Sequence, residues 1–113
     1  MKTPKIKLWL EDNGEIFGHG NYEILKAIEN YGSINESSKQ LKMSYKKAWL
    51  KKTSTEKFLG GDIFISKKGA SKDSGTNLSP KAKAIMNAYE QLESELNEFI
   101  KKRYDELFKD LLD

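Results

Sequence analysis

The sequence predicts a mainly α-helical fold with a small amount of β-structure, and three stretches of the chain support this class. Residues 32–52 carry the start signals of two successive helices. Residues 62–78 contain two short runs of β-forming residues around a polar segment with glycines. Residues 81–113 contain no Gly or Pro, and their apolar residues recur at helical spacing, which indicates one long helix.

Two of the predicted helices should meet across a short turn. Ser33 is followed three residues later by Glu36, the capping-box spacing in which each side chain bonds the other residue's backbone N–H. Ser44 can cap a second helix that begins at Tyr45, after a turn of roughly 3–4 residues. This is the helix-turn-helix arrangement, whose second helix enters the major groove of DNA. The exposed positions of this recognition helix are expected to include Tyr45, Lys46, Lys47, Lys51 and Lys52.

A longer helix over residues 21–31 should supply much of the core. Gly32 is placed to end it, and four of its side chains recur at helical spacing and should be buried: Ile24, Leu25, Ile28 and Tyr31. Tyr22 and Tyr31 could instead stack on bases, but aromatic residues at this spacing usually pack in cores. Ala48 and Trp49 are expected to point from the recognition helix back toward this core.

An N-terminal β-hairpin is predicted over residues 5–17. Polar and apolar residues alternate over residues 5–10, as in a half-buried strand. Residues 12–14 read Asp-Asn-Gly, a tight-turn signal, after which residues 15–17 can return as the second strand.

A second hairpin is predicted over residues 62–78. It follows a helical core at residues 21–58, of which residues 33–58 form the helix-turn-helix. Its strands, at residues 62–66 and 76–78, flank a polar loop, so the hairpin reads as a β-wing. Three lysines of the wing could reach backbone phosphates or the minor groove: Lys67, Lys68 and Lys72.

The last helix is predicted over residues 79–112. Ser79 caps it and Pro80 occupies its first position. At roughly 1.5 Å per residue this helix would be about 50 Å long, so it must overhang a small domain. A homodimer would cover its apolar stripe, through Ile85, Tyr89, Leu92, Leu96, Phe99 and Ile100. A broken helix that folds back on its own domain is the alternative.

Basic residues concentrate in the part of the chain that contains the recognition helix and the wing. The net charge is only +3, yet residues 39–72 contain 10 basic and 2 acidic residues, and the two flanking parts are both net acidic. A surface that neutralises phosphates and releases their counterions needs such segregation. A solvated lysine-rich face would also produce it, but the overlap with the predicted helix-turn-helix favours DNA.

Composition bears on the other classes of function. A chain of 113 residues can bury one core, so a single domain over residues 1–113 is expected. Cys is absent and His19 is the only histidine, so we expect no metal site, no cofactor and no enzyme activity. No apolar run approaches the roughly 18 residues of a membrane span and no signal peptide follows Met1, so we expect a cytoplasmic protein without membrane contact.

Several short motifs also point to a known family. They are Gly-Ser-Ile at residues 32–34, a small pair at residues 37–38, Leu41, and the run Met-Ser-Tyr-Lys-Lys-Ala-Trp at residues 43–49. With these motifs, the stretch from about residue 5 to about residue 95 resembles the N-terminal winged-helix domain of ModE-type regulators, molybdate-responsive relatives of the LysR regulators. The resemblance implies a dimeric DNA-binding winged helix-turn-helix, with residues 44–47 beginning the recognition helix and residues 67–77 forming the wing.

The sequence departs from this family pattern in four ways. Lys42 stands in the turn where these regulators commonly have Gly, and residues 50–58 are only loosely similar. The wing is rich in Lys and Ser where many relatives have almost only Gly. The molybdate-binding domain of full-length members is missing from these 113 residues, so we expect no molybdate or other oxyanion to bind this chain.

Two functions remain open on the sequence. The favoured one is sequence-specific binding of double-stranded DNA as a homodimeric transcriptional regulator, with contacts from Ser33, Ser44, Tyr45, Lys46, Lys47, Lys51, Lys67, Lys68 and Lys72. The alternative is an architectural DNA-binding or protein-interaction module with the same fold and little base specificity. The ratio of specific to non-specific affinity separates them, because a regulator should prefer its site by roughly 10³ or more.

Overall fold

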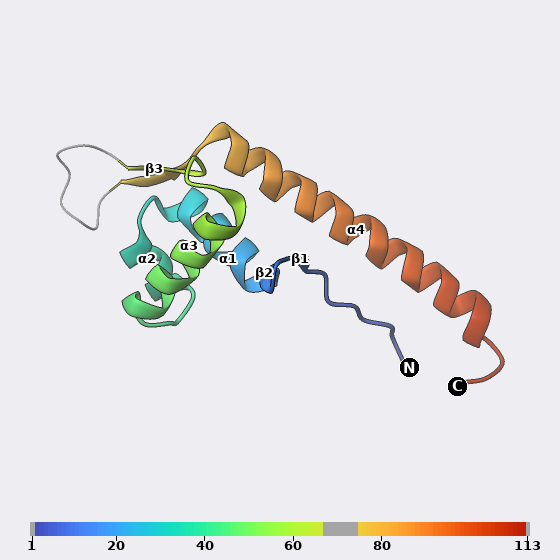
Figure 1. Ribbon diagram of the computed structural model, residues 1–113. Coiled ribbons are helices and arrows are strands. Elements are labelled where there is room, and N and C mark those ends of the chain that lie inside the picture. Colours follow the sequence, from blue (N-terminus) through green and yellow to red (C-terminus); the bar gives the residue numbers. More distant parts are fainter. Residues whose placement is uncertain (1, 67–74, 113) are drawn as a thin grey trace.

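The computed structural model describes residues 2–66 and 75–112. This part is mainly helical and contains two small antiparallel sheets, as the sequence predicts. In chain order the elements are β1 (Leu10–Asp12), β2 (Glu15–Phe17), α1 (His19–Tyr31), α2 (Ile34–Gln40), α3 (Tyr45–Leu59), β3 (Phe64–Ser66), β4 (Thr76–Leu78) and α4 (Pro80–Phe108). Figure 1 shows the three shorter helices gathered with both sheets at one end, and α4 projecting away from them.

The N-terminal hairpin is shorter than predicted. β1 pairs with β2 from Leu10 opposite Phe17 to Asp12 opposite Glu15. Asn13 and Gly14, with φ angles of 49° and 81°, form the two-residue turn that suits the twist of such a hairpin. The predicted strand over residues 5–10 is wrong except for Leu10, because the described residues before it have no strand beside them with which to pair.

Helix α1 begins two residues earlier than predicted and ends where predicted. The extended Gly18 precedes it, and the Gly18 N–H donates to Asn21 Oδ1 at 2.9 Å. At the other end Gly32 adopts a φ of 72°, a conformation that glycine tolerates better than other residues, and its N–H donates to the Ile28 carbonyl. The Gly32 carbonyl accepts hydrogen bonds from the N–H groups of Gly75 and Thr76, which ties this corner to β4.

The hydrophobic core lies where α1 meets β2, α3, β4 and α4. Its fully buried side chains are Phe17, Ile24, Leu25, Ile28, Ala48, Ile63, Ala82 and Met86. The expectation that Tyr31 belongs to this core is wrong, since Tyr31 is 45% exposed. It is the last residue of α1, and the chain turns away from the core directly after it.

Helix α3 buries one of the two residues that were predicted to face the core, so the prediction is confirmed for Ala48 only. Ala48 and Thr55, two turns apart, are completely buried, whereas Trp49 is 46% exposed, so its predicted place in the core is wrong. The buried face is lined by small side chains, which let α3 approach α1 closely. Thr55 Oγ1 accepts a hydrogen bond from Asn21 Nδ2 of α1 at 2.8 Å, which joins this face of α3 to α1.

The second hairpin begins later than predicted. β3 pairs with β4 from Phe64 opposite Leu78 to Ser66 opposite Thr76, and Ile63 before it is buried in the core. The Ser79 N–H donates to the Ile63 carbonyl at 2.9 Å, which joins the base of the hairpin to the start of α4. The predicted wing lysines Lys67, Lys68 and Lys72 lie outside the described residues.

Helix α4 is continuous over 29 residues, from Pro80 to Phe108. Ser79 caps it by accepting a hydrogen bond from the Ala82 N–H at 3.1 Å. The predicted end at residue 112 is four residues too far, since residues 109–111 form a turn. The described part extends 63 Å along its longest axis and has a radius of gyration of 17.3 Å, against about 13 Å for a compact domain of this size. The predicted overhang is therefore confirmed (Figure 1).

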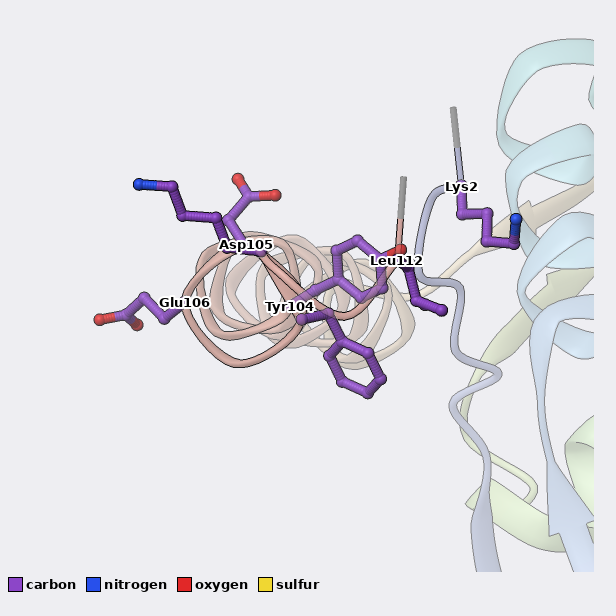
Figure 2. Close-up of a pocket in the computed structure, with 7 residues that line it drawn as sticks. Lys2, Tyr104, Asp105, Glu106 and Leu112 are labelled. Carbon is purple, nitrogen blue, oxygen red and sulfur yellow. The ribbon is translucent and has the colours of Figure 1, made fainter.

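Residues 2–9, which precede β1, run along α4 and do not form a strand (Figure 1). Near the core, the Tyr89 hydroxyl donates to the Leu8 carbonyl at 2.8 Å. Near the far end, Lys2 lies on one side of Leu112 and of the Tyr104 ring, while Asp105 and Glu106 point to the opposite side (Figure 2). Within the described part of the chain, no helix combines the length and hydrophobicity that a membrane crossing requires.

A cluster of aromatic side chains fixes the first third of α4 to the core. The Tyr89 ring packs edge-on against Phe17 at 5.4 Å and stacks on Tyr22 at 5.3 Å between ring centroids. The Tyr22 hydroxyl donates to the Glu90 carboxylate. Burial and this carboxylate raise the pKa of Tyr22 to about 12, so the tyrosine keeps its proton throughout the neutral range.

Candidate nucleic-acid interface

The turn between α2 and α3 has the geometry that the sequence predicts. Ser33 Oγ caps α2 by accepting from the Glu36 N–H at 3.0 Å, while the Glu36 carboxylate accepts from Gln40 instead of closing the capping box. Ser44 Oγ caps α3 by accepting from the Lys47 N–H at 3.1 Å. The two helices therefore meet across residues 41–44.

The first turn of α3 is exposed and basic. Tyr45 is 39% exposed, and Ser44, Lys46 and Lys47 are also exposed. Residues 37–55 contain six lysines and no acidic residue. Within the described part of the chain, Lys39, Lys42, Lys46 and Lys47 form no ion pair, so their charges are directed to solvent.

Lysines in the first turn of a helix do not stabilise that helix. The N-terminus of α3 carries partial positive charge, and a cation there costs about 0.3–1 kcal/mol. Lys46 and Lys47 both lie in this turn, which contains no acidic residue. An anion bound at this end would interact favourably with both lysines and with the helix dipole.

Lys51 and Lys52, both predicted to be exposed, are half-buried. The Lys51 ammonium lies over Gly20 at the start of α1, close enough that a Cβ on Gly20 would come within 2.6 Å of it. The Lys52 side chain is only 17% exposed; its ammonium lies 4.9 Å from the centre of the Phe64 ring and 3.7 Å from the Glu56 carboxylate. These contacts direct Lys52 toward the base of the second hairpin and away from the outer face of α3.

The outer face of α3 contains two large apolar side chains that were not predicted there. Trp49 was expected in the core, and no position was predicted for Leu50. Trp49 is 46% exposed and Leu50 is 51% exposed. The signal that could have found them is the spacing of Ala48 and Thr55, two small residues seven positions apart, which marks the side of close helix packing. Trp49 and Leu50 then lie to the side of that face and beyond it.

The residues predicted to form a dimer interface are not all free. Tyr89 is 4% exposed and is packed in the core of its own chain. Leu92 and Phe99, in contrast, are 44% and 62% exposed, and Ile85, Leu96 and Ile100 are half-buried. An apolar surface therefore remains along the overhanging part of α4.

The only histidine is not part of a metal cluster among the described residues. His19 lies at the exposed start of α1, with its Nε2 atom 3.8 Å from the Glu23 carboxylate. Over residues 2–66 and 75–112, no three His, Cys, Asp or Glu side chains gather in a way that could hold a metal ion.

Comparison with known proteins bears on the predicted resemblance. No protein-family model matches the chain. The chain is similar to the transcriptional regulator ModE of Haemophilus influenzae, with 33% identity over 94 residues. The predicted resemblance to ModE-type regulators is confirmed. The matched residues make up 82% of this chain and 37% of that relative, so the chain spans little more than a third of the ModE protein it matches.

The turn of the helix pair shows what the departure from the ModE-type pattern at residue 42 costs. Lys42 adopts a φ of 56°, in the left-handed region, and its N–H donates to the Lys39 carbonyl at 3.1 Å. A residue with a Cβ is strained in this conformation by about 1 kcal/mol or more, whereas glycine is not. The Gly that ModE-type regulators commonly have at this position is thus the residue that the backbone favours.

We expect Lys42→Gly to raise the free energy of unfolding by up to about 1 kcal/mol, because glycine relieves the left-handed strain. Lys42→Ala is the matched control: it removes the same charge but keeps the Cβ. Denaturant unfolding of the three proteins would measure the difference. Equal stability of the Gly and Ala variants would show that the backbone at residue 42 is unstrained.

Proposed function

We propose that this chain binds double-stranded DNA in a sequence-specific manner, as a homodimeric transcriptional regulator with a winged helix-turn-helix fold. The observation that carries the proposal is the exposed basic start of α3, which has no ion-pair partner among residues 2–66 and 75–112 and is held by the Ser44 cap across a short turn from α2. The similarity to a protein named transcriptional regulator ModE supports the same function. The proposal makes the chain a cytoplasmic binding protein without enzyme activity.

In this proposal α3 lies in the major groove. Tyr45, Lys46 and Lys47 lie on the exposed first turn, where base edges would come within reach. The Ser44 end of the helix and the Ser33 hydroxyl would contact phosphates on either side of the turn. Half-buried Lys51 would need to leave its place over Gly20 to join them.

The second hairpin is proposed to act as the wing. β3 and β4 extend beside the corner of Gly32, near the start of α2. Three lysines of the sequence between these strands are proposed to contact the DNA backbone or the minor groove: Lys67, Lys68 and Lys72.

The overhanging part of α4 is proposed to form the dimer. One recognition helix covers only a few base pairs, so a two-fold site needs two copies held about 34 Å apart. The apolar side chains Leu92 and Phe99 are exposed on α4, Leu92 just after the core residue Tyr89 and Phe99 further along the overhang. A second copy of the same helix would bury them in a symmetric interface.

Binding to single-base variants of the best site tests the proposed roles of α3 and the wing. Lys46→Ala or Lys47→Ala should cost about 1–3 kcal/mol at the best site and weaken the preference among bases, because these side chains reach base edges. Lys68→Ala should weaken binding to all sequences alike. Lys101→Ala, an exposed lysine on the overhanging part of α4, is the matched control and should change nothing.

The alternative function would give a different result in the same assay. Equal losses on every base variant for Lys46→Ala, Lys47→Ala and Lys68→Ala would place α3 on the DNA backbone. The chain would then be an architectural DNA-binding module, with little base specificity.

A further inference from the structure

Trp49 and Leu50 are two exposed apolar residues on the outer face of α3, next to the basic first turn of that helix. They lie one helical turn after Tyr45 and Lys46, so the four side chains form a continuous outer face. Exposures of 46% and 51% leave about half of each apolar side chain in water. Next along this face, the Thr53 hydroxyl donates to the Trp49 carbonyl at 2.8 Å and is thereby occupied within the helix.

The surroundings of this pair restrict what could cover it. Lys46 and Lys47 flank it without ion-pair partners among the described residues, and residues 37–55 contain no acidic side chain. An apolar protein surface would leave these charges without a partner. A partner that fits this surface presents negative charge beside an apolar group.

The major groove of DNA meets both conditions. Phosphates line its two edges, and the C5 methyl group of thymine is the apolar group that a base pair displays there. We propose that Trp49 and Leu50 determine specificity by packing against thymine methyl groups of the bound site. This inference rests on the proposed function and adds which base the centre of α3 selects.

Replacing thymine by deoxyuridine tests the proposal without changing the protein. Each thymidine of the best site is replaced in turn by deoxyuridine, which differs from thymidine only in lacking the C5 methyl group. The affinity for each duplex is measured by fluorescence anisotropy. At one or two positions in each half-site, the unmodified protein should bind the uracil duplex about fourfold more weakly, the equivalent of one buried methyl group. At the other thymines the two duplexes should bind equally.

Variants of the protein assign the effect to the two side chains. Leu50→Ala and Trp49→Ala should each bind thymine and uracil duplexes equally at one of the sensitive positions. Ile16→Ala is the matched control, because Ile16 is an equally exposed apolar residue on β2, at 53%, and should keep the full discrimination.

The outcomes separate this inference from the proposed function. Tight, salt-sensitive binding with equal affinity for thymine and uracil at every position would overturn the role of Trp49 and Leu50 and leave the DNA-binding function standing. Sensitivity to the methyl group that survives in both alanine variants would also overturn it. Absence of salt-sensitive binding to any duplex would overturn the proposed function itself.

Discussion

The affinity of this chain for duplex DNA is expected to fall about 10³–10⁵-fold between 50 and 200 mM salt. Residues 37–55 contain six lysines and no acidic residue, and within the described part of the chain Lys46 and Lys47 form no ion pair. Such a surface would neutralise phosphates. Two copies that contact roughly 6–10 phosphates release a corresponding number of counterions. The logarithm of the affinity should therefore fall linearly with the logarithm of the salt concentration, with a slope of about −5 to −9.

Fluorescence anisotropy at several salt concentrations measures this slope directly. Lys68→Ala, in the proposed wing, should reduce its size by about 1 for each subunit, since one phosphate contact is lost. Lys101→Ala, on the overhanging part of α4, should leave it unchanged. A slope near zero for the unmodified protein would show that the basic surface does not face DNA.

The parts of the fold that the sequence predicted well are those with local signals. Ser44 and Ser79 cap the helices that they were expected to cap, because a cap depends on a hydroxyl and a backbone N–H three residues later. The long α4 followed from the absence of Gly and Pro. Asn13 and Gly14 form the predicted turn because both accept a positive φ.

The predictions of the fold that were wrong concern features that depend on contacts between residues far apart in the sequence. A strand needs a partner, and residues 5–9 have none among the described residues, so their alternation does not make a strand. The prediction that Trp49 faces the core was also wrong, because it depends on how α3 is rotated about its own axis. Its apolar residues lie on several sides of the helix, and only the close approach to Asn21 of α1 decides that Thr55 is inside and Trp49 outside.

The candidate site was predicted in outline for the same reason. The capped start of α3 was correct, so Tyr45, Lys46 and Lys47 were placed on the exposed side. Lys52 was misplaced because its contacts with Phe64 and Glu56 arise only when the second hairpin packs beside the helix. The apolar centre of the site was missed because tryptophan is expected inside a small domain.

A charged residue on the apolar stripe of the overhanging part of α4 is expected to abolish the proposed dimer. Leu92 and Phe99 are exposed in the single chain, and Leu96 lies half-buried between them. A glutamate at Phe99 would be harmless in a monomer, where the position is 62% exposed. In a dimer it would be buried without a partner, at a cost of several kcal/mol per subunit.

We therefore expect Phe99→Glu and Leu96→Glu to give folded monomers that keep weak, salt-sensitive DNA binding but lose the preference for a palindromic site, because the spacing of the two recognition helices is lost. Light scattering with a parallel gel-shift assay measures both properties, and thermal unfolding checks that each variant is folded. Asn97→Glu is the matched control, since it adds the same charge at an exposed polar position between the two substitutions and should remain dimeric. A wild-type chain that is monomeric at tens of micromolar would contradict the proposed dimer before any variant is made.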